Sequence, residues 1–270
     1  MMSDLPILKA VKLLQITDTH CYAADDSRLE WSDLELYPNK SLIRVLDHLT
    51  QLSGDYDALI ISGDLVQEET VATYQRLHGI LNDFPLPVYI LPGNHDVPEL
   101  MRSELSAQSE RIHYVTHTAF GRWHAVFVDT HLTGHPEGDI SEEEFAELKR
   151  TLDELPLAEH AVIFMHHHPV PIGSPWMDHM GLKQTEPFWS LLADFPQVRS
   201  VVFGHIHSEF STEYPVTAER NIRVLGTPAT CVQAKHNDEE MQLDDTRPAW
   251  RELVLRPDGQ VETAVSYLPN

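Results

Sequence analysis

Short apolar runs rich in branched side chains recur along the chain, each followed by small or polar residues. Runs of four to seven such residues between turn-forming segments are typical of buried β-strands. The predicted strands are residues 11–17, 58–62, 88–91, 125–129, 161–165 and 200–203.

Between these runs, apolar residues recur at intervals of three and four, which is the spacing of one face of an α-helix. Ser141 followed by Glu144 resembles a capping box and predicts that a helix begins there, with Leu148 facing inward. The other predicted apolar faces carry Leu42, Leu46 and Leu49 in a first helix, and Tyr74, Leu77 and Leu81 in a second.

The C-terminal part alternates between apolar and polar residues, as antiparallel strands do. Its predicted strands are residues 223–226, 251–255 and 261–267, and a turn at residues 257–259 joins the last two. Residues 233–248 are polar and acidic and are interpreted as a loop. Strands that alternate with helices imply layered α/β packing. Without a repeat or a clear linker, residues 1–270 are expected to form a single domain.

Possible metal ligands follow five of the predicted strands, at the end where each strand stops. They are Asp18 and His20, Asp64, Asn94 with His95 and Asp96, the run His166, His167 and His168, and His205 with His207. Each group alone has an ordinary explanation as a turn or a cap. Because open α/β sheets bind ligands outside the carboxyl ends of their strands, the ordered set of five predicts one shared crevice.

The residue types narrow the kind of metal. Imidazole and carboxylate together suit zinc, iron or manganese, whereas calcium prefers oxygen ligands alone. The set is too large for one tetrahedral zinc ion. It suits two ions about 3.5–4 Å apart that share a carboxylate. Cys21, beside His20, is a candidate soft ligand, but a single thiol among harder ligands favours a packing role.

Charge and composition restrict the class of protein. The formal net charge is −23, which argues against general binding to a nucleic-acid backbone. Metal ions would invert the negative electrostatic field locally, so that the site could bind an anionic substrate. No apolar run approaches the length of a membrane span, and the N-terminus lacks a signal-peptide pattern. With only two cysteines in the chain, a disulfide framework is not expected. These features predict a cytoplasmic protein without a membrane or nucleic-acid partner.

The five groups, in order, resemble the calcineurin-like metallophosphoesterase family: Asp18-x-His20, Gly63-Asp64, Gly93-Asn94-His95-Asp96, His166-His167 and Gly204-His205-Ile206-His207. The resemblance implies a four-layer α/β sandwich of two mixed sheets flanked by helices. It also implies a metal held by Asp18, His20 and His207, a second metal held by Asn94, His166 and His205, and Asp64 as the bridge between them. Iron or manganese is favoured for the two divalent ions, with zinc as the alternative.

The run of three histidines leaves the fourth group ambiguous. Side chains alternate along a strand, so His166 and His168 would share one side while His167 faces away. The family pattern favours His166, the first histidine after the strand. His167 or His168 stays open as the alternative ligand.

Flanking segments extend the resemblance to the bacterial class III cyclic-AMP phosphodiesterases. They are FMHHHPVP, WMDHMGLK, FGHIH and GTPATCVQ. This resemblance implies hydrolysis of 3′,5′-cyclic AMP to 5′-AMP by a hydroxide that bridges two metal ions, which would lower the pKa of the parent water. His20, Asn94, His95 and His207 would bind the substrate. The loop with Trp176, Met177, His179 and Met180 would either cover a base-binding cleft or pack on the core.

Two residues have predicted roles in proton transfer. His95 is the candidate that protonates or stabilises the leaving alkoxide. Asp96 would orient His95, or would simply cap the turn. The alternative functions are a broader phosphoesterase that acts on another diester or a phosphomonoester, and a non-catalytic metal-binding scaffold. Edge strands are compatible with a homodimer without requiring one.

Overall fold

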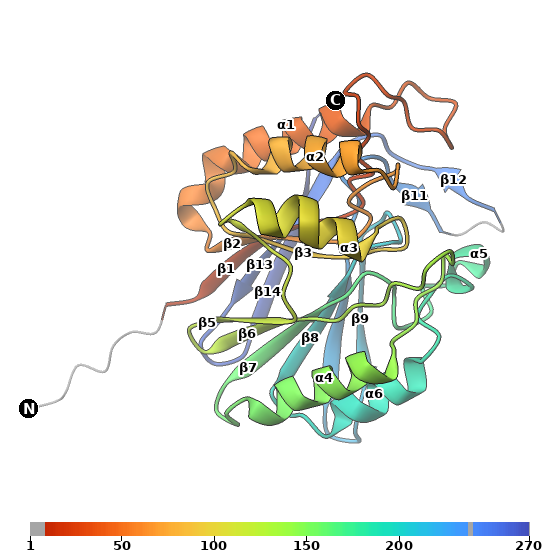
Figure 1. The fold of residues 1–270 in the computed structure, drawn as a ribbon. Coiled ribbons are helices and arrows are strands. Elements are labelled where there is room, and N and C mark those ends of the chain that lie inside the picture. The colour runs from red at the N-terminus through yellow and green to blue at the C-terminus, as the bar shows by residue number, and fades with distance from the viewer. Residues whose placement is uncertain (1–8, 237–239, 270) are drawn as a thin grey trace, which may run out of the picture.

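Two six-stranded sheets packed face to face form the centre of the protein, as the computed structural model of residues 9–236 and 240–269 shows (Figure 1). The first sheet has the order β14–β13–β1–β2–β3–β4. Its strands are β1 (Val11–Ile16), β2 (Ala58–Ser62), β3 (Val88–Leu91), β4 (Ile112–His113), β13 (Ala249–Leu255) and β14 (Val261–Tyr267). Neighbours β1, β2, β3 and β4 run parallel, whereas β13 and β14 pair antiparallel.

The second sheet has the order β5–β6–β7–β8–β10–β9. Its strands are β5 (His117–Phe120), β6 (Trp123–Phe127), β7 (His160–Phe164), β8 (Val198–Phe203), β9 (Phe210–Pro215) and β10 (Asn221–Gly226). Parallel pairing joins β6, β7, β8 and β10, and the edge strands β5 and β9 are antiparallel to their neighbours. Both sheets are therefore mixed.

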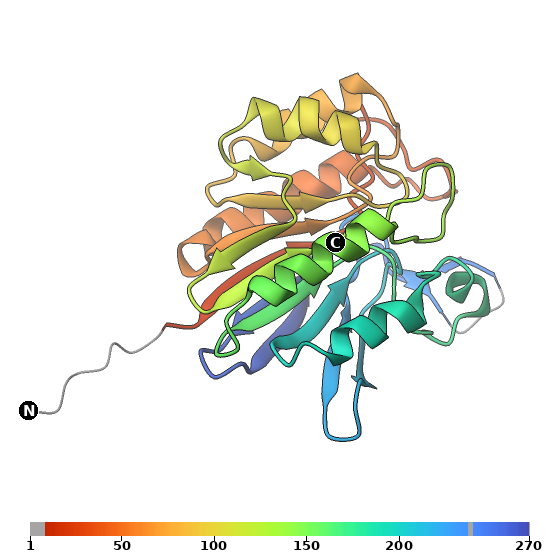
Figure 2. The same cartoon turned by 60° about the horizontal axis from the view of Figure 1, so that its bottom comes forward.

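Helices cover the outer face of each sheet (Figures 1 and 2). Over the first sheet lie α1 (Pro38–Leu52), α2 (Val71–Leu81) and α3 (Pro98–Leu100) with its continuation into a π turn (Met101–Leu105). Over the second lie α4 (Glu142–Glu154) and α6 (Thr185–Ala193). Shorter helical pieces are α5 (Pro175–Asp178) and the 3₁₀ turns Ser53–Asp55 and Ser106–Gln108. The expected four-layer α/β sandwich is confirmed.

The central strands are continuous apolar runs because they are buried on both faces. In β1, Leu13 packs between the two sheets, whereas Leu14 and Ile16 pack beneath α1 and α2. The side chains of β2 also point to both faces, with Ile60 between the sheets and Ile61 under the helices. Full burial of one such side chain contributes about 1.5–3 kcal/mol, so the central strands form a rigid support for the loops at their ends.

The structure corrects two expectations for the C-terminal part. The predicted hairpin is confirmed in β13 and β14. Residues 223–226 belong to β10 in the other sheet, where β10 pairs antiparallel with β9, as expected of its pattern, and parallel with β8. Alternation identifies a strand but not its partner. The segment interpreted as a loop contains β11 (Ala234–Lys235) and β12 (Gln242–Leu243), which pair antiparallel. Strands of two residues are too short to show a period.

Candidate metal centre

The loops that follow β1, β2, β3, β7 and β8 meet at one edge of the sandwich and bring the predicted ligands together. One group joins Asp18, Asp64 and His166, and a second joins His20, Asp64 and His95, with the ligand atoms of each group within 4.8 Å of one another. Asp64 belongs to both groups. Strands from both sheets contribute, so the centre lies where the two sheets meet.

The backbone at these residues has an unusual conformation. Asp18, His20, Asp64, His205 and His207 all have positive φ, between 45° and 67°. For residues other than glycine, such a conformation costs about 1–3 kcal/mol each and persists only where the surroundings impose it. Two backbone hydrogen bonds help to impose it, from Asp18 N to Gly63 O at 3.0 Å and from His20 N to Asp64 O at 3.0 Å.

Close packing of the backbone explains one glycine of the motifs. A Cβ atom at Gly93 would lie 2.2 Å from Asp64 Oδ1 and 2.8 Å from His166 Nε2. Both atoms belong to predicted metal ligands. Any side chain at position 93 would therefore enter the space between the ligands.

The ligand side chains lie close together but leave buried polar atoms unsatisfied. His207 Nε2 is 3.3 Å from Asp18 Oδ1, and His20 Nε2 is 3.3 Å from His207 Nε2. Within the described residues, Asn94 Oδ1 forms no hydrogen bond. Asp18 Oδ1 and His166 Nε2 have only imidazole–carboxylate contacts of 3.3 Å, to His207 Nε2 and to Asp64 Oδ1. Buried polar atoms without partners carry a cost of about 1–3 kcal/mol each, which a bound cation would remove. The donor set thus fits the ions that the sequence predicts.

In His166 and His207, backbone oxygen atoms bond to Nδ1, which leaves Nε2 free to bind metal. His207 Nδ1 bonds to Val232 O at 2.8 Å, and His166 Nδ1 bonds to Ser62 O at 2.8 Å. His205 differs, because its Nε2 contacts Met180 O at 3.0 Å.

The run of three histidines does not alternate as a strand would, because β7 ends at Phe164. His166, His167 and His205 offer ring nitrogens within 4.8 Å of one another. His167 Nδ1 contacts Thr130 Oγ1 at 2.7 Å, and its buried Nε2 forms no hydrogen bond with the described residues. His168 is buried, with Nε2 3.7 Å from Asp178 Oδ1. His167 therefore turns toward the centre and does not face away.

The two predicted proton-transfer residues differ in their surroundings. The His95 ring is partly exposed, lines the cavity and lies 5.1 Å from the His20 ring, and its backbone N–H donates to Asp64 Oδ1 at 2.9 Å. The Asp96 carboxylate is buried and accepts hydrogen bonds from Gly93 N at 2.9 Å and from Leu65 N and Tyr74 Oη. Burial raises the pKa of Asp96 to about 7. Asp96 thus contacts the backbone of the loop that carries His95.

Asp64 carries a charge although it is buried. Burial alone would raise its pKa, but the nearby His166 and His95 rings hold the pKa of Asp64 well below its ordinary value. A carboxylate that stays ionised in the interior, surrounded by imidazoles, is suited to bind cations.

A cavity of about 210 Å³ opens above these side chains. Its floor includes His20, Asp64, Asn94, His95, His205 and His207, and its walls include Trp31, Trp176, Met177, Met180 and Met241. Trp176, Met177 and Met180 line the cavity and also pack against the hydrophobic core of the second sheet, so the expected packing on the core is confirmed, and the cover of a base-binding cleft stays a prediction. The exposed His179 is not among the lining residues. Trp31 and Met241 carried no signal in the sequence, because only the fold brings their segments to the cavity.

Comparison with known proteins agrees with this arrangement. The sequence profile of the calcineurin-like phosphoesterase family matches residues 11–209. The chain is 33% identical to a 3′,5′-cyclic adenosine monophosphate phosphodiesterase of Vibrio vulnificus, over 98% of this chain and 93% of that protein. It is 34% identical to the protein of the same name from Escherichia coli K12, over 96% and 90% of the two chains.

Solved structures show the same fold at low sequence identity. A dimetal phosphatase from Danio rerio superposes with a TM-score of 0.64 at 13% identity, covering 95% of this chain and 99% of that one. A purple acid phosphatase from yellow lupin superposes with a TM-score of 0.65 at 13% identity, covering 97% and 54%. Among the described residues, no helix is long and apolar enough to cross a membrane. The chain belongs to the calcineurin-like phosphoesterase family.

Proposed function

We propose that this protein hydrolyses 3′,5′-cyclic AMP to 5′-AMP with the help of two divalent metal ions. The observation that carries the proposal is the convergence of buried Asp, Asn and His side chains, with unsatisfied donor atoms, beneath an apolar-walled cavity. Support for the substrate comes from relatives named as cyclic-AMP phosphodiesterases, which are 32–34% identical over nearly the whole chain.

The proposed ligands divide into two sets that share Asp64. Asp18, His20 and His207 would hold one ion, and Asn94, His166 and His205 would hold the other. Iron and manganese are favoured, with zinc as the alternative. When bound, such ions supply a Lewis acid for the phosphoryl oxygens and lower the pKa of a water molecule.

The chain's own residues would bind and protonate the substrate. His20, Asn94, His95 and His207 line the cavity where the phosphodiester would lie. His95 would donate a proton to the 3′ oxygen as its bond to phosphorus breaks, while a water oxygen forms the new bond and releases one of its protons to solvent. Asp96 would act on His95 indirectly, since its carboxylate fixes the backbone at Gly93 and Leu65.

The apolar walls would receive the base of the nucleotide. Trp31 and Trp176 are planar, and Trp31 is fixed by a hydrogen bond from its Nε1 to Gln67 Oε1 at 3.3 Å. Small-molecule sites commonly combine apolar walls with a few polar groups that fix orientation. We further propose that the protein acts as a single domain, residues 1–270, in the cytoplasm, without nucleic-acid or membrane partners, and that a homodimer is compatible with its edge strands.

The test is metal-restored hydrolysis. The purified protein would be stripped with a chelator, reloaded separately with manganese or iron, and assayed for conversion of cyclic AMP to 5′-AMP. A generic aryl phosphodiester and 2′,3′-cyclic AMP would be assayed in parallel. Turnover that strongly favours 3′,5′-cyclic AMP is expected. Turnover of the aryl diester alone would contradict the assignment of cyclic AMP as the substrate and would leave the proposed metal centre standing. Absence of any metal-dependent hydrolysis would contradict the proposal that the protein is an enzyme.

A further inference from the structure

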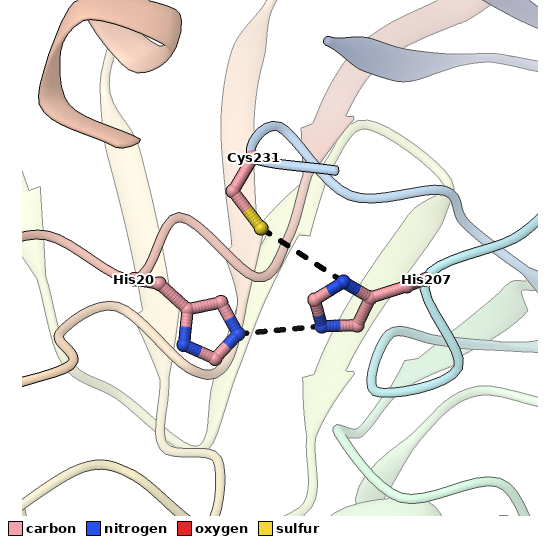
Figure 3. Close-up of side chains that lie close together, drawn as sticks. All are labelled: His20, His207 and Cys231. Atoms are coloured by element: carbon pink, nitrogen blue, oxygen red, sulfur yellow. Dashed lines mark hydrogen bonds between the residues drawn. The ribbon is translucent and has the colours of Figure 1, made fainter. Parts of the chain in front are cut away.

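The segment GTPATCVQ, residues 226–233, follows from the end of β10 and provides none of the proposed metal ligands. It nevertheless lies beside them, since Cys231 Sγ is 3.8 Å from His207 Nδ1 (Figure 3). Its polar side chains, among them Thr227 and Thr230, are buried. Buried polar groups cost free energy unless they are hydrogen-bonded, so their partners indicate what this segment does.

The backbone of the segment is bonded to the ends of two strands that precede ligand loops. Thr227 N donates to Phe203 O at 2.9 Å, at the end of β8. Thr230 N donates to Thr17 O at 3.1 Å, in the residue directly before Asp18. Because β8 and β1 belong to different sheets, the segment connects the two sheets at the proposed centre.

A chain of buried hydrogen bonds leads from Thr227 to a third ligand loop. Thr227 Oγ1 donates to Gln15 Oε1 at 2.6 Å, and Gln15 Nε2 donates to Ser62 Oγ at 2.8 Å. All three side chains are fully buried. Ser62 is also the residue whose backbone oxygen bonds to His166 Nδ1 at 2.8 Å. The Gln15 amide, held at both ends, therefore fixes Ser62 relative to Thr227.

The other end of this chain is a buried cation. Arg251 in β13 is 2% exposed, and its guanidinium donates to Thr227 Oγ1 at 3.0 Å, to Gly226 O at 2.7 Å and to Thr263 Oγ1 at 2.9 Å. Burial lowers the pKa of Arg251 to about 10, so the guanidinium stays charged at neutral pH. A charged donor polarises the hydroxyl that accepts from it and strengthens the hydrogen bond that this hydroxyl donates.

We propose that Thr227 is a positioning residue of the metal centre. Its hydroxyl connects Arg251 to Gln15, which fixes Ser62, and the Ser62 carbonyl orients the ring of His166. This inference rests on the proposed dinuclear centre. Removal of a hydrogen-bonding partner that supports a ligand ring typically lowers metal affinity about 10- to 100-fold. The loss is expected at the metal position to which His166 belongs.

Thr227→Val tests this role, because valine keeps the shape of the side chain and removes the hydroxyl. Competition of manganese against a chromophoric chelator should show affinity lowered about 10- to 100-fold at one of the two positions. Thr227→Ser keeps a hydroxyl and should restore the affinity. Thr263→Val is the matched control, because it removes another hydroxyl acceptor of Arg251, on the edge strand β14 beyond β13, and it should keep wild-type affinity.

Gln15→Leu interrupts the same chain at its next member and decides the question if Thr227→Val does not fold. The double variant should lose about as much manganese affinity as either single variant, because residues of one network do not contribute additively. Wild-type affinity in Gln15→Leu or in folded Thr227→Val, or an equal loss in Thr263→Val, would overturn the proposal. A wild type that binds no manganese would overturn the dinuclear centre itself, so the two failures are distinguishable.

Discussion

At the scale of single residues, the centre depends on side chains held in conformations that they would not adopt alone. Asp18, His20, Asp64, His205 and His207 all have positive φ. Strain of this kind is maintained by the rest of the fold, so the donor atoms are positioned before any ion binds.

Replacing His95 by alanine tests its proposed role as the proton donor. Loss of a positioned general acid lowers turnover by about 10²–10⁴-fold where the leaving group needs a proton. We expect that loss with cyclic AMP, whose leaving group is an alkoxide. An aryl diester with an acidic phenol as its leaving group should lose far less, and kcat for both substrates, measured on protein with equal metal content, would show it. Equal losses of kcat would mean that His95 does not protonate the leaving group.

At the scale of elements, the Ser141–Glu144 pair both caps the N-terminus of α4 and bonds this helix to a neighbouring loop. Ser141 Oγ accepts a hydrogen bond from Glu144 N at 3.1 Å, as the predicted capping box requires. In a complete capping box, the Glu144 side chain would accept a second hydrogen bond from the backbone N–H of Ser141. Here Glu144 Oε1 accepts a hydrogen bond from Asp129 N at 3.0 Å instead. Glu144 thus connects α4 to the loop that follows β6.

Substituting Ser141 by alanine should remove the cap and lower the free energy of unfolding by about 1 kcal/mol. Urea unfolding followed by circular dichroism would measure the change. Ser53→Ala is a suitable comparison, because the Ser53 hydroxyl bonds Thr50 O at the C-terminal end of α1 and caps no N-terminus. A cost for Ser141→Ala no larger than that of Ser53→Ala would contradict the capping role.

Glu144 also gives the fold a dependence on pH. Burial raises the pKa of Glu144 from 4.5 to about 7. The folded state therefore binds the proton more tightly than the unfolded chain, and stability present below pH 4.5 is lost as pH rises to about 7. Glu144→Gln keeps the acceptor for Asp129 N and cannot ionise. At pH 8 it should exceed wild type in stability by about 1–3 kcal/mol.

Urea unfolding of wild type and Glu144→Gln across pH 4 to 8 would measure this effect. The two curves should approach each other at the acidic end, where the wild-type carboxyl is protonated. A constant difference across the range would show that the substitution acts through packing and not through ionisation.

At the scale of the whole molecule, the proposed centre joins the two halves of the sandwich. Its ligands follow β1, β2 and β3 of the first sheet and β7 and β8 of the second. An ion bound there would connect loops from both sheets. Metal binding and global stability are therefore expected to be linked.

Adding metal to the stripped protein at about 100 times its dissociation constant should stabilise it by about 2.7 kcal/mol. At about 2–4 °C per kcal/mol for a chain approaching this size, the melting temperature should rise by about 5–10 °C. Differential scanning calorimetry with manganese would measure the shift. Asp64→Ala, which removes the shared carboxylate, should show little or no rise and should also lose metal-dependent activity. A full rise in that variant would place the stabilising ion elsewhere.

The sequence by itself determined the central strands, the helices α1, α2 and α4, and the candidate ligands. Strands such as Ala58–Ser62 are apolar throughout because both faces are buried, and that pattern is local. The helix Val71–Leu81 was equally visible from its spacing. Asp, Asn and His residues at strand ends predicted a shared crevice because parallel strands end on one side of a sheet. The roles assigned to His95 and Asp96 stay predictions.

Only the tertiary structure decided which residues from distant segments meet. Residues 223–226 were recognisable as a strand, but their pairing with β8 and β9 is a long-range contact that the local pattern does not specify. His167 turned toward the centre because β7 ends before the histidines. Cys21 was the thiol next to a ligand in sequence, yet Cys231 is the thiol beside the ligands in space. The spacing of apolar residues shows which face of a helix or strand is buried. The contacts between distant segments depend on how the loops fold over the ends of the two sheets.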